Sequence, residues 1–403
     1  MSVSVRYMGT KSHLAPKVRN VLEGISTPGP IADLFSGMGS VARCLAPTYP
    51  VITSDQLAFT ACFARVQLLD RRRSDLATLR REIGPRYRSH LRLLNDVFSR
   101  RLLQERRALN GSWPDLRLWM LTAPHVGTSE TYARRARSAA LANTRKDRYC
   151  LATLYFSASY FSTEQAIALD SLRGAIDNVS RVSDREWLIA AWLATAGRII
   201  NAPGHTAQFL TPHNKTTFAR ISRLWRRKVW DVFWQQALAM NPVGTARWRR
   251  MNAVLVGDSL KLLRTGRLKE AQVIYADPPY TRDQYSRYYH VYETLFSYDF
   301  PVSTGYGRYR GDRFTTPFSV LGKCEAAFDE LFRLCAENGS TLLLSYPSNG
   351  LLSRAGAKVT DLLEMHLRVR EKLMFTPSFS TLGASKGSSR KRTREHLYVC
   401  SPK

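Results

Sequence analysis

Two kinds of hydrophobic pattern divide the chain. Short apolar runs typical of buried strands occur near both ends, whereas longer amphipathic segments typical of helices fill the middle. Residues 31–35 form the first apolar run, followed by a glycine-rich turn and a helix expected to begin near Ser40. Residues 49–55 read as a second strand that ends in an acid. This order predicts the beginning of a βαβ unit.

Strand patterns return after residue 250. They cover residues 252–259, 272–280, 340–350, 370–377 and 394–400, with helix-like runs at 323–337 and 355–367. The last two strands are expected to form a terminal hairpin. The two ends of the chain together therefore predict one α/β sheet. Residues 383–394, low in complexity and basic, are expected to form a mobile loop.

The middle of the chain predicts a mostly helical inserted domain over residues 60–250. Two helices there begin with sequences typical of a capping box, at Ser162 and at Ser183. The segment carries 33 basic and 14 acidic side chains, which is most of the net charge of +28. Such an excess attracts polyanions and predicts salt-dependent nucleic-acid binding. A solvated arginine-rich surface without a partner is the alternative.

Composition narrows the class of protein. With 403 residues, 44% of them hydrophobic, the chain can form two or three globular domains. The longest apolar stretch, 187–196, is about half of a bilayer span, and no signal peptide precedes the first strand. The six cysteines are scattered without a CxxC pair, so neither a zinc site nor a disulfide framework is expected. A bacterial or archaeal cytosol fits best, with no membrane and no metal.

The turn "FSGMGS" is the first candidate for a ligand site. Gly37 and Gly39 lie between a strand and a helix, where a ligand can approach the backbone and the N–H groups of the helix. Asp55, at the end of the second strand, is placed to accept hydrogen bonds from ribose hydroxyls. A purely structural turn and a helix cap are the alternatives. Together the two features favour a cofactor that contains a nucleoside.

The strand end "DPPY" is the second candidate. The exocyclic amine of a purine is a poor nucleophile because its lone pair is delocalised into the ring. The carboxylate of Asp277 and the carbonyl of Pro278 could each accept an N–H and relocalise that lone pair. Pro279 stiffens the strand end, and Tyr280 could stack on the base. The electrophile would then be a methyl group on a sulfonium, unless the motif only ends a strand in a turn.

These residues resemble a known family. "FSGMGS" and "DPPY" are similar to the cofactor loop and catalytic motif of S-adenosylmethionine-dependent DNA adenine-N6 methyltransferases, and "RYMGTKSHL" resembles the N-terminal motif of the Dam-like group. The order of motifs, with a long insert before "DPPY", matches that group. The resemblance implies a Rossmann-like class I methyltransferase sheet with helices on both faces, formed by 1–59 and 251–403, and target recognition by 60–250.

The resemblance also implies roles for individual residues. The catalytic set would be Asp277, Pro278, Pro279 and Tyr280. The set that binds S-adenosylmethionine would be Tyr7, Lys11, Asp33, Phe35, Ser36, Gly37, Gly39, Ser40, Asp55, Asp258 and Ser259. Tyr7 and Lys11 would contact the methionine end, Asp55 the ribose and Asp258 the adenine. The insert is longer than the recognition domain of Dam, so no target sequence is implied.

Residues that contact DNA are predicted from charge alone. The candidates are arginine and lysine clusters, namely Arg71, Arg72, Arg73, Arg134, Arg135, Arg137, Arg226, Arg227, Lys228, Arg308 and Arg310. Behind the catalytic motif, Tyr288, Tyr289 and Tyr292 either brace a flipped base or belong to the core, and His290 is expected to be a structural, hydrogen-bonded residue.

The expected function is site-specific methylation of adenine N6 in double-stranded DNA by base flipping. RNA adenine methylation remains an alternative because its chemistry is the same, and so does a non-catalytic DNA-binding subunit with the same fold. Methylation of protein glutamine fits less well. A restriction-modification or phage-defence context, with a nuclease or another defence subunit as partner, is left open.

Overall fold

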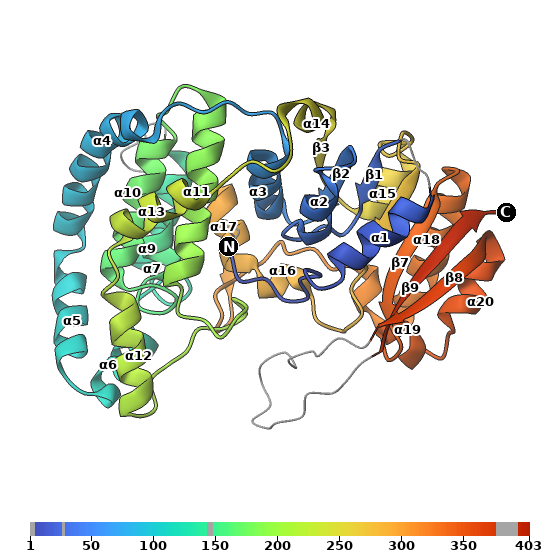
Figure 1. Cartoon of the computed structure of the whole chain (residues 1–403). Helices are drawn as coiled ribbons and strands as arrows, with labels where there is room; N and C mark the ends of the chain where they lie inside the picture. Colours follow the sequence, from blue (N-terminus) through green and yellow to red (C-terminus); the bar gives the residue numbers. More distant parts are fainter. Residues whose placement is uncertain (1–4, 26–28, 143–147, 376–393) are drawn as a thin grey trace. The chain divides into compact units, whose positions relative to one another are not determined.

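The computed structural model describes residues 5–25, 29–142, 148–375 and 394–403, and its chain divides into two compact units. The sheet unit consists of residues 7–70, 242–286 and 314–403, and the helical unit of residues 1–6, 71–241 and 287–313 (Figure 1). Most of the low-complexity segment at 383–394 lies outside the described residues.

The sheet unit is built on seven strands in the order β3-β2-β1-β4-β7-β9-β8. Strands β3, β2, β1, β4 and β7 pair in parallel, whereas β9 runs antiparallel to both neighbours. The bounds are β1 Ile31–Asp33, β2 Val51–Asp55, β3 Ala253–Val256, β4 Val273–Ala276, β7 Thr341–Pro347, β8 Leu367–Phe375 and β9 Glu395–Pro402. The expected α/β class and the terminal hairpin are thereby confirmed.

Two apolar layers cover the sheet because successive strand residues point to opposite faces. Ile274 and Leu342 pack on one face, whereas Val273 and Leu343 pack on the other. Helices α15 Ser259–Arg264, α18 Leu321–Glu337, α19 Leu351–Arg354 and α20 Val359–His366 cover the first face. Helices α1 Ala15–Ile25 and α2 Ser40–Leu45 contribute to the second. The unit also holds α3 Ala58–Leu68, α14 Ala246–Met251 and the 3₁₀ turn η1 Pro317–Ser319.

The helical unit forms around two helices whose residues are mostly buried, α10 Thr163–Ile176 and α11 Val182–Ile199. Trp192 of α11 is fully buried, and its indole N–H donates to the carbonyl of Leu169 at 2.9 Å. The other helices are α4 Leu76–Val97, α5 Ser99–Asn110, α6 Trp113–Thr122, α7 Glu130–Leu141, α9 Leu151–Phe156, α12 Lys215–Trp225, α13 Val229–Ala239 and α17 His290–Ser297. A small hairpin joins β5 Ser303–Thr304 to β6 Tyr309–Arg310, and α16 spans Tyr285–Tyr288.

The bounds of the two units differ from the predicted domains. Residues 60–70 and 242–250 belong to the sheet unit, and residues 287–313 to the helical unit. Buried hydrogen bonds explain the second difference: the hydroxyl of Tyr298 donates to Asp170 at 2.5 Å, and a ring nitrogen of His290 lies 2.8 Å from the carbonyl of Thr206. That residues 60–250 form a target-recognition domain stays a prediction.

One predicted helix start is confirmed and one is wrong. Ser162 and Gln165 form the expected capping box of α10. Helix α11 instead begins at Val182, with Arg181 as its N-cap, so Ser183 already lies inside the helix. Within its first turn, Asp184 is buried and accepts hydrogen bonds from the backbone and hydroxyl of Ser74 at 2.6 and 2.7 Å, a tertiary contact that the local sequence does not show.

None of the helices in the described part of the chain combines the length and apolarity that a bilayer span needs.

Candidate active site

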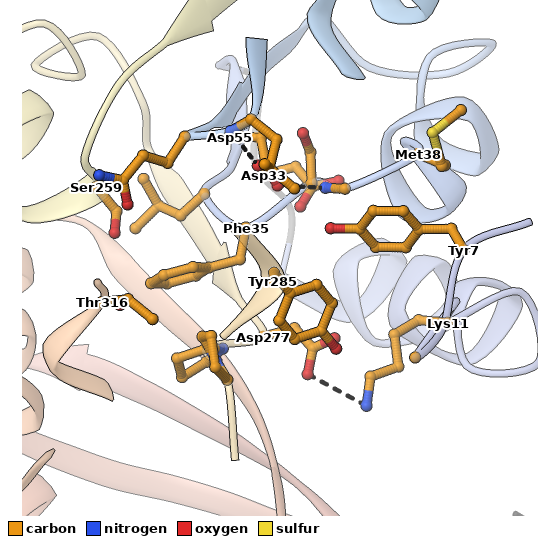
Figure 2. Close-up of a pocket in the computed structure, with 18 of the residues that line it drawn as sticks. Tyr7, Lys11, Asp33, Phe35, Met38, Asp55, Ser259, Asp277, Tyr285 and Thr316 are labelled. Carbon is orange, nitrogen blue, oxygen red and sulfur yellow. Dashed lines mark hydrogen bonds and ion pairs between the residues drawn. The ribbon is translucent and has the colours of Figure 1, made fainter. Parts of the chain in front are cut away.

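A pocket of about 920 Å³ lies at the carboxyl ends of the parallel strands in the sheet unit. It brings together three segments far apart in sequence, namely residues 7–11, the glycine turn 33–41 and the strand end 275–280 (Figure 2). Ligands of open α/β sheets bind at this edge, where neighbouring strands connect in opposite directions.

The glycine turn is held open by backbone geometry. Gly37 and Gly39 have φ angles of +48° and +69°, in the left-handed region that favours glycine. A Cβ on Gly37 would lie 2.7 Å from Cε1 of Tyr7. The Tyr7 ring therefore packs so close to the turn that only glycine fits at this position without a shift. Helix α2 begins at Ser40, as predicted.

Two carboxylates, Asp33 buried and Asp55 partly buried, fix the turn to the sheet. Asp33, at the end of β1, accepts a hydrogen bond from the N–H of Ala42 at 3.1 Å. Asp55, at the end of β2, accepts from the N–H groups of Gly37 and Leu57, each at 2.8 Å. Burial raises the pKa of Asp33 to about 7 and that of Asp55 to about 6. Asp55 therefore shapes the turn and also lines the pocket.

The catalytic candidate Asp277 stands directly after β4 and is part of a buried charge cluster. Its Oδ1 lies 3.2 Å from the ammonium of Lys11, and Lys11 also forms an ion pair with Glu395 at the start of β9. The hydroxyl of Ser345 donates to Glu395 at 2.5 Å. We name Lys11, Asp277 and Glu395 the charge cluster.

Burial and neighbouring charges set the protonation of this cluster. Burial raises the pKa of Asp277 most, Lys11 lowers it and Glu395 raises it, and together they bring that pKa to about 7. Burial alone would lower the pKa of Lys11, but Asp277 and Glu395 outweigh it and raise that pKa. Lys11 therefore stays cationic, and Asp277 changes protonation near neutral pH.

Aromatic side chains surround the rest of the strand end. Tyr280 is partly buried against the core, and the ammonium of Lys11 lies 5.3 Å from its ring centroid. The rings of Tyr7 and Tyr285 are 5.7 Å apart, and Phe35 meets Phe318 edge to face at 5.3 Å. Tyr280 and Tyr285 both line the pocket, which leaves flat apolar surfaces beside Asp277.

The pocket contains the predicted cofactor and catalytic residues apart from Gly39. Those present are Tyr7, Lys11, Asp33, Phe35, Ser36, Gly37, Ser40, Asp55, Asp258, Ser259, Asp277, Pro278, Pro279 and Tyr280. Gly39 is the N-cap of α2 between two lining residues. Asp258 also caps α15, because its carboxylate accepts from the N–H of Lys261 at 3.0 Å.

Sequence reasoning missed several residues of the site. Glu395 and its partner Ser345 were not predicted, nor were the lining residues Gln56, Tyr275, Phe314 and Thr316. Glu395 is 384 positions from Lys11, and no local motif marks it. The one available signal is an acidic residue at the start of a buried strand, which needs a partner.

The predicted DNA contacts fall into two groups. Arg71, Arg72, Arg73, Arg134, Arg135, Arg137, Arg226, Arg227 and Lys228 are exposed in the helical unit. Arg308 and Arg310 are buried, which corrects the prediction that they face DNA. Arg308 donates to the carbonyls of Tyr155 and Ser157 at 2.6 and 3.0 Å, and Arg310 is held by Asp299 and Asp312.

The residues behind the catalytic motif are mostly core. Tyr289 and Tyr292 are buried, whereas Tyr288 is partly exposed. His290 is fully buried, and burial lowers its pKa to about 3. Its structural role is confirmed by its contact with the carbonyl of Thr206.

Comparisons with known proteins show what this strand end is similar to. Residues 248–334, which contain β4 and the Asp277–Tyr280 motif, match the family model of D12 class N6 adenine-specific DNA methyltransferases. The chain is also 22% identical over 354 residues to Modification methylase LlaI of Lactococcus lactis subsp. lactis. Both matches support an adenine-specific DNA methyltransferase.

The seven-stranded, mostly parallel sheet fits a methyltransferase fold. The similarity to the Lactococcus protein covers 86% of this chain but 47% of that relative. The chain therefore spans about half the length of the curated relative that it matches. The D12 class match covers the strand end but leaves out the glycine turn and Lys11, which enter the same pocket from elsewhere in the sequence.

Proposed function

We propose that this chain transfers a methyl group from S-adenosylmethionine to the N6 amine of adenine in double-stranded DNA. The observation that carries the proposal is the pocket itself, because it joins the Asp277–Tyr280 strand end of the D12 class match to a glycine turn at the edge of a parallel sheet. An adenine in a duplex must leave the base stack to reach a pocket of this kind, so the reaction includes base flipping.

The lining of the pocket fits the proposed cofactor. Among the described lining residues, the charged side chains are Asp33, Asp55, Asp258, Asp277 and Lys11. S-adenosylmethionine carries an ammonium and a sulfonium, which carboxylates attract. Its ribose hydroxyls can donate hydrogen bonds to carboxylates. Tyr7, Phe35 and the glycine turn would hold it, with Asp55 and Asp258 toward its nucleoside. When bound, it supplies a methyl group that is activated for transfer.

Asp277 has the central role in the proposed reaction. Its carboxylate and the carbonyl of Pro278 accept the two N–H groups of the adenine amine, which directs the nitrogen lone pair toward the methyl group. Tyr280 stacks on the base and keeps the amine near Asp277. After transfer the amine nitrogen is cationic and releases one proton, for which Asp277 is the nearest acceptor in this arrangement.

Lys11 and Glu395 act through Asp277 as positioning residues. The ammonium of Lys11 lies between the two carboxylates, and Glu395 is fixed in turn by Ser345. A carboxylate held by a buried ion pair keeps one orientation, which is what relocalising a lone pair requires. Removing one partner would leave a buried charge without compensation.

A methyl-transfer assay with labelled S-adenosylmethionine tests the proposed function. The substrates are duplex DNA, hairpin RNA and total protein, each with wild-type protein. Label in duplex DNA supports the proposal, and label in RNA or protein alone would replace it by the corresponding activity. Label in none of the three, with cofactor binding intact, would favour a non-catalytic DNA-binding subunit. A role in modification beside a nuclease belongs to the same proposal, because the Lactococcus relative is named a modification methylase.

A further inference from the structure

A second pocket, of about 850 Å³, lies within the helical unit and apart from the residues of the candidate active site. Its walls are the end of α11, the segment 200–206 that follows, and one side of α12, with Arg6 and Tyr292 completing it. Neither the D12 class match nor the charge clusters predicted from sequence explain why a cavity should form here.

Five arginines line this pocket, from the N-terminal segment, from α11, and from α12 and the turn that follows it. They are Arg6, Arg198, Arg220, Arg223 and Arg227, all of them exposed. Among the described residues that line the pocket, none carries a carboxylate. Arg227 is held over the end of α11, because its guanidinium donates to the carbonyl of Arg198 at 3.1 Å. Like charges gathered around one cavity repel, and a bound anion offsets that repulsion.

One lining residue of the pocket, Asn201, has a buried side-chain oxygen for which the described residues offer no partner. The amide nitrogen of Asn201 donates to the carbonyls of Ser159 and Leu210 at 3.1 and 2.6 Å, which fixes Oδ1 as the remaining acceptor. Asn201 is 1% exposed, and in the described residues its Oδ1 has no hydrogen-bond partner. A ligand in the pocket that donates an N–H or O–H to this oxygen would give it the partner that buried polar groups normally have.

A flat surface lines the same pocket. The His205 ring stacks on Tyr288 at 4.6 Å with an interplanar angle of 9°, and His205 and Tyr292 both face the cavity. Stacked rings of this kind provide a platform for a base. Guanidinium groups, a free acceptor and a ring platform together match the phosphate, the amine and the base of a nucleotide.

We propose that this pocket binds a nucleotide, with its phosphate on the arginines and its base toward His205 and Asn201. The bound nucleotide is either a free mononucleotide or one nucleotide of a DNA strand held by the helical unit, since both present the same chemical groups. Binding of a DNA strand rests on the proposed function, whereas binding of a free mononucleotide does not.

The test compares the full-length wild-type protein with the double variant Arg220→Gln/Arg223→Gln. The matched control is Arg86→Gln/Arg92→Gln, which removes two exposed arginines from α4 that do not line the pocket. The probes are dAMP, titrated by calorimetry, and a short DNA duplex, titrated at several salt concentrations. Thermal unfolding of each variant verifies that the fold is retained.

For a free mononucleotide, the pocket variant binds dAMP about tenfold or more weakly than wild type, and the control binds it normally. For a nucleotide within a strand, the slope of log affinity for the duplex against log salt falls by roughly two in the pocket variant and by less in the control. Two results together overturn the proposal. The first is that dAMP affinity is the same in all three proteins or is undetectable in all of them, and the second is that the two variants have the same salt slope. Because neither readout involves methyl transfer, duplex methylation measured in parallel decides the proposed function separately.

Discussion

The protonation of Asp277 links the buried charge cluster to the proposed reaction. A carboxylate can accept both the N–H of the amine and the released proton only in its ionised form. Burial raises the pKa of Asp277 to about 7, with Glu395 raising it and Lys11 lowering it. The fraction of Asp277 that is ionised therefore grows as pH rises through neutrality.

We expect kcat for DNA methylation to rise with pH, with its midpoint near the pKa of Asp277 at about 7, and to reach a plateau at higher pH. Glu395→Gln removes a negative charge that raises this pKa, so the midpoint should move to lower pH. The plateau kcat should fall at the same time, because Lys11 loses its second partner. Single-turnover rates measured across the pH range provide the test.

Ser345→Ala is the matched control for that experiment. It removes the hydrogen bond to Glu395 but keeps all three charges of the cluster. The midpoint of its kcat–pH curve should equal that of the wild-type protein, while its plateau kcat falls modestly. If Glu395→Gln shifted KM alone and left both the midpoint and the plateau unchanged, Glu395 would have no positioning role.

Gly37 in the glycine turn has a backbone conformation and a close neighbour that a larger residue would not tolerate. The φ of Gly37 is +48°, and a Cβ there would meet the ring of Tyr7. Gly339, after α18, has a φ of +71° with nothing within 4 Å of a Cβ. An alanine would strain the backbone at either position. Only at Gly37 would its methyl group also meet a neighbouring side chain.

Gly37→Ala should weaken S-adenosylmethionine binding, by about tenfold or 1.4 kcal/mol, because Tyr7 must move away from the turn. Gly339→Ala should leave that affinity unchanged. Both substitutions should lower the free energy of unfolding by about 1–2 kcal/mol, the cost of an alanine in the left-handed region. Calorimetric cofactor titration and urea unfolding of the two variants separate the effects. Equal cofactor affinities would remove the turn from the binding site.

The strands and the turn were predictable because their signals are local. Apolar runs ending in Asp55 and Asp277, and the two glycines before Ser40, determine a short stretch of backbone with little help from the rest of the chain. Helix starts are less secure: the sequence around Ser183 fits a capping box, but the contact of Asp184 with Ser74 is tertiary and has no sequence signature.

The missed parts of the site depend on long-range pairing. Glu395 meets Lys11 only because the antiparallel strand β9 inserts between β7 and β8. That register pairs Glu395 with Pro347 and brings its side chain beside Ser345. Likewise, the buried Arg308 donates to carbonyls of Tyr155 in α9 and of Ser157 directly after it, 153 and 151 positions away. An arginine-rich loop is the same in sequence whether it faces DNA or the interior.

The net positive charge of the chain is the reason for expecting a polyanionic partner. Only exposed arginines and lysines can contribute to its binding. Neutralising Arg226, Arg227 and Lys228 to Gln should flatten the slope of log DNA affinity against log salt by about one to three units, roughly 0.9 per lost phosphate contact. Arg310→Gln should leave the slope unchanged, because Arg310 is 9% exposed and paired with Asp299 and Asp312. Fluorescence anisotropy at several salt concentrations measures both slopes. An unchanged slope in the triple variant would make that cluster a solvated surface.

The most direct measurement is the identity of the methylated nucleoside. Duplex DNA treated with wild-type protein and S-adenosylmethionine is digested, and its nucleosides are separated by mass, beside a reaction with the Asp277→Ala variant. We predict N6-methyladenine as the product of the wild-type protein and a loss of about 10²–10³-fold in the variant, which should still bind cofactor and DNA. Methyl groups on another nucleoside, or variant turnover above about a tenth of wild type, would contradict the assignment of Asp277 and of the reaction.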